Sequence, residues 1–138
     1  MTLSQLSDTL PNGLHDAELF GCNVSFIAGT VVLDIAIDVS TMEADGYFED
    51  AEIRLTELLT IVLDAPCIGV PMGSSLLVLD CETDAGCYPA FSAVPQDIRH
   101  KFYSLYLGHP CNTFMHIAAE SAEIEWKKGS RRKGSRRV

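Results

Sequence analysis

Basic side chains are scarce in most of this chain. The first 126 of its 138 residues contain three Lys and Arg (Arg54, Arg99 and Lys101) against all nineteen Asp and Glu, which gives this part a formal net charge of −16. A surface with that charge repels a phosphate backbone. The shortage of positive charge therefore disfavours nucleic acid as a partner of the main body of the protein.

Long apolar runs and a secretory signal are also missing. No apolar run approaches the about 18 residues that a membrane-spanning helix needs. The first fifteen residues contain neither Lys nor Arg nor a long apolar block, so they do not have the pattern of a signal peptide. We therefore expect a soluble, cytoplasmic protein that does not bind a membrane.

The chain lacks the common motifs of metal, cofactor and catalytic sites. Its five cysteines form no CxxC pair, and an odd number without a secretory signal indicates free thiols, which are usually small buried apolar groups. His100, His109 and His116 have no second His three or four residues away, and there is no phosphate loop, dinucleotide-binding glycine pattern or Gly-x-Ser-x-Gly. We predict no catalytic residue, no metal and no cofactor.

Strand patterns dominate what is present. Between Thr30 and Ser40, five aliphatic residues alternate with other residues, which places them on one face of a strand: Val31, Leu33, Ile35, Ile37 and Val39. A preceding strand over Asp16–Ala28, with a bulge at Gly21, is expected to form a hairpin with it around Gly29.

Further strands are predicted along the rest of the chain. They cover Tyr47–Asp64 in two pieces, Ser75–Glu82, Ile98–Leu107 and Thr113–Trp126, while Met1–Gly13 is a lead-in that ends in a Pro-Asn-Gly turn. The total is about seven or eight strands. The predicted fold is mainly β, with α+β as the alternative, arranged as a curved antiparallel sheet, a sandwich or a partly open barrel.

The last twelve residues differ in composition from the body. Residues 127–138 carry seven Lys and Arg and contain an exact tandem, Lys128-Gly-Ser-Arg-Arg132 followed by Lys133-Gly-Ser-Arg-Arg137. We predict one acidic domain over residues 1–126 and a disordered basic tail over 127–138. The tail is an incidental addition, a tether that folds back on the acidic body, or a nucleic-acid or targeting segment.

Five of the acidic residues between positions 34 and 52 are the candidates for partner binding. They are Asp34, Asp38, Glu49, Asp50 and Glu52. Asp34 and Asp38 share a strand face but are about 13 Å apart at the usual strand rise, too far for a catalytic dyad. These acids therefore indicate either a solvated face or a patch for a basic partner.

His15 and Asp16 are the other pair of interest. Adjacent residues of an extended segment point to opposite faces, so we do not expect a direct His–Asp relay. A structural role at the edge of the first strand is the preferred interpretation.

The stretch Leu10-Pro-Asn-Gly-Leu-His-Asp-Ala-Glu-Leu19 resembles the start of a group of small uncharacterised bacterial domains. In that group a β-hairpin follows, then a strand similar to Ala51-Glu-Ile-Arg-Leu55, and the end is similar to residues 119–126. Some relatives are classed as immunity proteins of bacterial toxin systems. The resemblance implies an all-β or α+β domain that binds another protein, and the basic tail departs from the pattern.

These observations favour a non-enzymatic domain that binds a basic protein through its acidic surface. Electrostatic attraction accelerates such association. Two alternatives remain open. One is a self-associating accessory protein, such as a homodimer that pairs exposed strand edges. The other is an enzyme or small-ligand binder with a site near His15, Asp16 and His116.

Overall fold

The structure of the chain, a computed structural model, describes residues 1–63, 76–82, 95–107 and 113–134. Within these residues it contains one short α-helix, a 3-10 helix and seven strands, which confirms the prediction of a mainly β fold. The elements are α1 (Leu3–Asp8), β1 (Glu18–Ser25), β2 (Thr30–Asp38), β3 (Tyr47–Leu63), β4 (Leu76–Glu82), η2 (Gln96–Lys101), β5 (Phe102–Leu107), β6 (Thr113–Trp126) and β7 (Arg132–Lys133).

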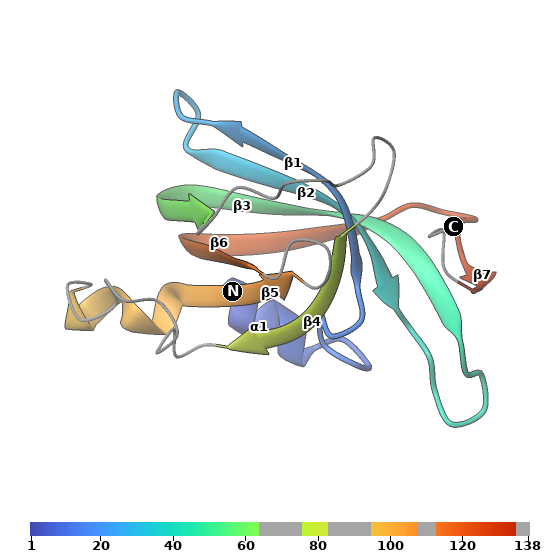
Figure 1. Cartoon of the computed structure of the whole chain (residues 1–138). Coiled ribbons are helices and arrows are strands. Elements are labelled where there is room, and N and C mark those ends of the chain that lie inside the picture. The colour runs from blue at the N-terminus through green and yellow to red at the C-terminus, as the bar shows by residue number, and fades with distance from the viewer. Residues whose placement is uncertain (64–75, 83–94, 108–112, 135–138) are drawn as a thin grey trace.

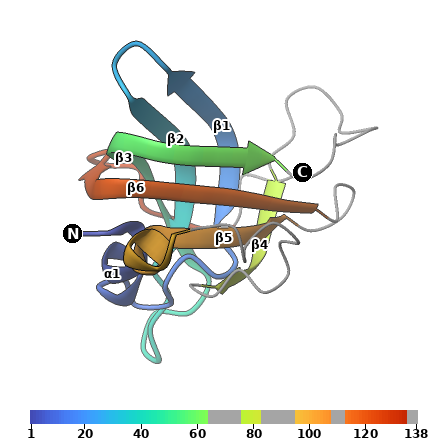
Figure 2. The ribbon, with the colours of Figure 1, turned by 90° about the vertical axis from the view of Figure 1, so that its left-hand side faces the viewer.

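The strands form one antiparallel sheet that curls on itself (Figures 1 and 2). Their order is β2-β1-β4-β5-β6-β3-β7, and β2 also pairs with β3. Six strands are thus linked in a ring, although the β1–β4 ladder joins only Glu18–Leu19 to Leu76–Leu77. The result is a half-barrel, in agreement with the predicted curved sheet.

Strand β2 follows the predicted alternation. Its odd-numbered residues from Val31 to Ile37 have no exposed surface and face the core together with Ala51, Ile53 and Leu55 of the neighbouring β3. The register pairs Ile35 with Ala51 and Asp34 with Glu52. Since side chains alternate between the two faces of a strand, the same register that buries the apolar residues sends the acids outward.

The β1–β2 hairpin is confirmed, and so is the bulge near Gly21, because the register shifts between Leu19 and Gly21. Gly29 occupies the turn with a φ of +65°, a conformation that glycine adopts without strain. The tip of the hairpin projects from the sheet (Figure 1) and exposes Phe26 and Ile27 almost completely.

Strand β3 corrects the expectation of two separate pieces. It runs without interruption from Tyr47 to Leu63 and pairs with β2 in its first half and with β6 over most of its length. Glu57 has a φ of +53°, and the register against β6 shifts between Leu58 and Thr60. A β-bulge therefore joins the two predicted pieces, since one extra residue bends a strand without ending it.

The lead-in forms a helix that the periodicity did not predict. At the start of α1, Oγ1 of Thr2 accepts a hydrogen bond from the backbone N–H of Gln5, and Oε1 of Gln5 accepts one from the backbone N–H of Thr2. Such a capping box is readable in sequence as Thr-x-x-Gln. The helix has only six residues, so its stability depends on burying Leu3 and Leu6. The predicted Pro-Asn-Gly turn follows it.

The segment predicted as a strand over Ile98–Leu107 begins as η2 and becomes extended only at Phe102. From there its two faces are those expected, with Tyr103, Leu105 and Leu107 in the core. Among the cysteines, Cys22 is exposed, contrary to the expected burial. Cys67, Cys87 and Cys111, like His109, lie outside the described residues.

None of the helices in the described part of the chain has the length and apolar character needed to cross a membrane.

Candidate functional site

Four of the predicted acidic residues lie on adjoining parts of β2 and β3. Asp34 is directly opposite Glu52 in the β2–β3 register, and Glu49 and Asp50 lie at the start of β3. Because side chains alternate along a strand, Asp50 and Glu52 point to the same side of the sheet as Asp34, whereas Glu49 points to the side of its β2 partner Ile37. We call Asp34, Glu49, Asp50 and Glu52 together the acidic face, since they surround the first residues of β3. Like charges this close on a sheet repel one another, so the face favours a cationic neighbour.

That neighbour is the start of the basic tail. Residues 127–134, here called the basic segment, follow β6 directly and lie along the first residues of β3 (Figure 1). The backbone N–H of Lys127 donates to the carbonyl of Asp50 at 2.9 Å, and that of Gly134 to the carbonyl of Gly46 at 2.7 Å. Between these bonds, Arg132–Lys133 form β7 against Tyr47–Phe48.

This position differs from the disorder predicted for the tail. The prediction of disorder rested on composition, because residues 127–134 include no apolar side chain that could be buried. The structure instead orders residues 127–134 through strand pairing and ion pairs, and residues 135–138 lie outside the described part. Of the three interpretations of the tail, the tether on the acidic body matches this arrangement.

Three ion pairs join the basic segment to the acidic face. Nζ of Lys127 lies 3.0 Å from Oδ1 of Asp34, and Nη1 of Arg132 lies 2.9 Å from Oδ1 of Asp50.

Arg131 makes the third pair. Its Nε and Nη2 donate to one oxygen of Glu49, at 3.2 and 2.9 Å. Glu49 retains only 19% of its side-chain exposure, but Arg131 retains 63%, so this pair is open to solvent on the side of the arginine. The Arg132–Asp50 pair, at 26% and 13%, is better shielded than an ordinary surface pair.

Ser130 fastens the turn between the two ends of the basic segment. Its Oγ accepts a hydrogen bond from the backbone N–H of Asp50 at 3.0 Å and donates to the carbonyl of Lys127 at 2.5 Å. The hydroxyl thus links the turn to β3, next to the carboxylate that holds Arg132.

The acidic surroundings affect the protonation of Lys127. The hydrogen bond to Asp34 raises the pKa of the Lys127 ammonium, and the nearby charges of Asp34, Glu52 and Asp50 act in the same direction, against a smaller opposing effect of desolvation. The cation is therefore more stable on this face than free in water.

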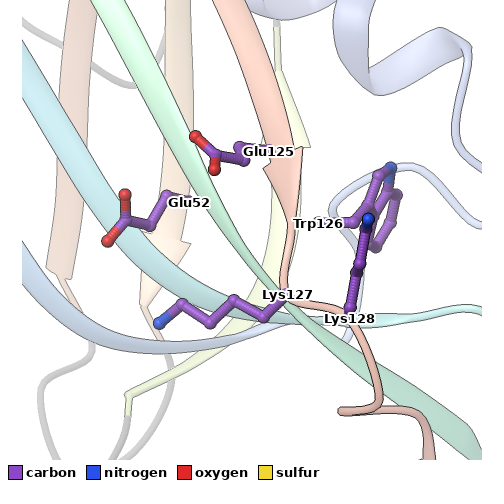
Figure 3. Close-up of a pocket in the computed structure, with 5 residues that line it drawn as sticks. All are labelled: Glu52, Glu125, Trp126, Lys127 and Lys128. Carbon is purple, nitrogen blue, oxygen red and sulfur yellow. The ribbon is translucent and has the colours of Figure 1, made fainter.

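Glu52 does not pair with an arginine of the segment but lines a pocket beside it (Figure 3). The pocket has a volume of about 340 Å³ and is lined by Glu52, Glu125, Trp126, Lys127 and Lys128. Glu52 and Glu125 are opposite each other in the β3–β6 register, and Lys127 extends to their side of the strand while Trp126 and Lys128 lie on the other side (Figure 3). Two carboxylates beside an ammonium suit a cationic or mixed-charge ligand.

Asp38 has a different environment from the other predicted acids. Its Oδ1 accepts a hydrogen bond from the backbone N–H of Ser40 at 2.9 Å, and its carbonyl accepts one from Nδ2 of Asn12 at 3.2 Å. These bonds attach the loop after β2 to the turn after α1.

His15 and Asp16 contact each other, contrary to the prediction. Nδ1 of His15 lies 3.1 Å from Oδ2 of Asp16, with both side chains at least half exposed. The prediction assumed an extended backbone, but Asp16 has a φ of +61° and lies in the turn before β1. The rule of opposite faces holds for an extended strand and therefore does not apply in this turn.

His116 lies elsewhere, fully buried on β6. Its Nδ1 is 2.7 Å from Oγ of Ser104, directly opposite on β5, and its ring stacks on Phe102. The contacts of His15 and of His116 thus involve different elements and do not bring His15, Asp16 and His116 into one site. Among the described residues, no three His, Cys, Asp or Glu side chains are grouped so that they could hold a metal ion.

The sequence prediction missed the basic half of the site. Lys127, Ser130, Arg131 and Arg132 belong to a tail whose contacts depend on where β6 ends. The available signal was the opposite net charge of the two parts, −16 for the body and +7 for the tail. It indicates that they attract each other but not which residues form contacts.

Comparison with known proteins adds a similarity in structure. A solved structure of an uncharacterized protein from Neisseria gonorrhoeae matches with a TM-score of 0.34 and 11% sequence identity, over 80% of this chain and 91% of that chain. No protein-family model and no curated protein matches the chain.

Proposed function

We propose that the chain is a non-enzymatic binding domain that holds a basic partner protein on its acidic face. The observation that carries the proposal is the convergence of Asp34, Glu49 and Asp50 on three cationic side chains, each at 3.0 Å or less. Lys and Arg side chains thus find carboxylates at hydrogen-bonding distance and in suitable directions on this face.

The net charge of the body supports this proposal independently. A body at −16 attracts a basic protein over a distance of about 10 Å at moderate ionic strength and raises the rate of encounter. Immunity proteins that cover the active site of a basic toxin work in this way, and residues 10–19 resemble the start of domains some of which are classed with them. A cytoplasmic site of action fits the same proposal.

The test measures binding of a defined basic probe to the full chain. Since Arg131 and Arg132 occupy the carboxylates, the protein used is the double variant Arg131→Gln/Arg132→Gln. The probe is a fluorescently labelled peptide with the sequence of residues 127–134, followed by anisotropy. We expect saturable binding that weakens as salt is added, because these charges are partly exposed.

Two further variants locate the binding surface. Adding Asp34→Asn, Glu49→Gln and Asp50→Asn is expected to abolish binding. The matched control neutralises three acids outside the acidic face, Asp8, Glu57 and Asp97, and therefore changes the net charge equally. Equal loss in both would show that only net charge matters, and absence of binding to the double variant would refute the proposed function.

A further inference from the structure

The first residues of β3 offer more than carboxylates. The β3–β6 ladder ends where Ala51 pairs with Trp126, and on the other side β2 pairs with β3 as far as Phe48. Along residues 47–50 one edge of β3 therefore depends on the basic segment for its strand partner, which is β7. An edge of this kind accepts any extended chain that supplies backbone hydrogen bonds.

We infer that this edge and the acidic face together form a docking site for an extended basic peptide of a partner protein, and that the basic segment occupies the site in the free chain as an internal competitor. The inference rests on the proposed function and specifies its partner and its regulation. It implies that binding has two steps, release of residues 127–134 and insertion of the partner's peptide as an antiparallel strand beside β3.

The contacts of the basic segment define the pattern that the site recognises. Lys127 meets Asp34, Ser130 meets the backbone of Asp50, Arg131 meets Glu49 and Arg132 meets Asp50. Read along the chain, this is Lys-x-x-Ser-Arg-Arg. Arg131 and Arg132 are consecutive in the sequence, and so are Glu49 and Asp50, the carboxylates that they contact. The order of the residues in the peptide therefore matters as well as its charge.

The basic segment binds the acidic face weakly enough for a partner's peptide to displace it, yet it still lowers the apparent affinity of that peptide. Its ion pairs are partly exposed, and pairs of this kind contribute little individually and are screened by salt. Its attachment to β6 gives it an effective concentration on the order of millimolar at the site. A peptide in solution thus competes with a local ligand of similar sequence, and its apparent affinity falls.

The experiment compares the full-length wild-type chain with two double variants of equal charge. One is Arg131→Gln/Arg132→Gln, which removes the docked arginines. The other is Arg136→Gln/Arg137→Gln, which makes the same change in the second copy of the repeat. All three are titrated with the labelled peptide of residues 127–134 and with a permuted peptide of the same composition in which the arginines are separated.

We expect the first variant to bind the peptide about tenfold more tightly than the wild type, and the second to bind like the wild type. The permuted peptide should bind the first variant several-fold more weakly. Before any peptide is added, the fluorescence of Trp126, the single tryptophan of the chain and the residue before Lys127, should differ from that of the wild type in the first variant alone, because the segment is released there.

The outcomes separate this inference from the proposed function. If the wild type and both variants bind the peptide equally, the face binds basic chains but the segment does not compete, and the inference fails while the proposed function stands. If the permuted peptide binds as well as the original, the site has no sequence pattern and the strand-pairing part fails. If no variant binds, the proposed function fails with it.

Discussion

Arg132 and Asp50 are 82 positions apart in the sequence, yet Nη1 of Arg132 donates to Oδ1 of Asp50 at 2.9 Å. The two side chains are 26% and 13% exposed, and the same Nη1 also donates to the carbonyl of Ser130. This pair connects the end of the basic segment to the start of β3, and it is the most shielded of the three ion pairs described between the basic segment and the acidic face.

Replacing Arg132 by Gln is expected to lower the free energy of unfolding by about 1 kcal/mol, because it breaks a partly buried ion pair. Urea denaturation followed by Trp126 fluorescence measures the change. The control is Arg137→Gln, which makes the same substitution in the second repeat and should change the free energy by less than about 0.5 kcal/mol. If Arg132→Gln lowers the free energy of unfolding no more than Arg137→Gln does, the Arg132–Asp50 pair does not contribute to stability.

A negative charge at Ser130 is expected to release the basic segment. In Ser130→Asp the new carboxylate lies beside Asp50 and Glu49, and like charges at this distance repel. Ser130→Ala removes only the hydrogen bonds and should weaken docking less. Hydrogen exchange of residues 127–134 measures release, with Ser135→Asp as the control in the second repeat, and equal protection in Ser130→Asp and the wild type would exclude this repulsion.

Docking of Lys127 should depend on alkaline pH in a defined direction. The pKa of Lys127 is raised above 10.5 in the folded chain, so the cation binds its proton more tightly when docked. The stabilisation is therefore complete below pH about 10.5 and is lost as the pH rises through the higher folded-state value. The loss is measured by NMR, as a change in the side-chain chemical shift of Asp34 between pH 9 and pH 12, recorded in steps of about 0.5 pH unit.

Lys127→Arg supplies the control for that titration, because a guanidinium remains protonated throughout the same range. The shifts of Asp34 should then stay constant. A parallel change in both proteins would assign the transition to another group.

Glu57→Gly is expected to stabilise the protein, which is unusual for a glycine in a strand. The φ of +53° at Glu57 costs a residue with a side chain about 1–2 kcal/mol, more than the entropy that glycine loses on folding. A net gain of about 0.5–1 kcal/mol in the free energy of unfolding is expected. The exposed Arg54, in the regular part of β3, is the control, since Arg54→Gly should destabilise by about 1 kcal/mol.

Ser104→Ala should destabilise the protein by about 1–3 kcal/mol, because it removes the hydroxyl 2.7 Å from Nδ1 of the buried His116. Thermal unfolding measures the effect. Ser121→Ala, at a half-buried position of β6, is the comparison and should have a smaller effect. A variant at Ser104 that is as stable as the wild type would mean that the Ser104–His116 hydrogen bond contributes nothing to folding.

Local patterns in the sequence were sufficient for much of the fold. The period of two in β2 identified its buried face, and Gly21 and Gly29 marked the bulge and the turn, because each of these features depends on residues close together in the chain. The helix α1 had a readable cap in Thr2 and Gln5, but six residues produce no helical period.

The candidate site was predictable only in part. The acids of β2 and β3 were identified from the sequence, and the alternation that buries Ile35 and Ile53 directs Asp34, Asp50 and Glu52 outward. Their union into one face depends on the register of β2 against β3, which sets Asp34 opposite Glu52. A shift of one residue would turn one of the two strands over and separate them.

Composition and local order thus established the charge of this protein, its strands and its mainly β class. The place of its basic segment was decided by the tertiary structure alone. Strand β6 ends opposite Ala51, so the chain leaves the sheet beside Glu49 and Asp50, and residues without any intrinsic preference for order become a strand there. Long-range pairing sets that exit point, and electrostatic attraction between segments more than 70 residues apart has no local signature in the sequence.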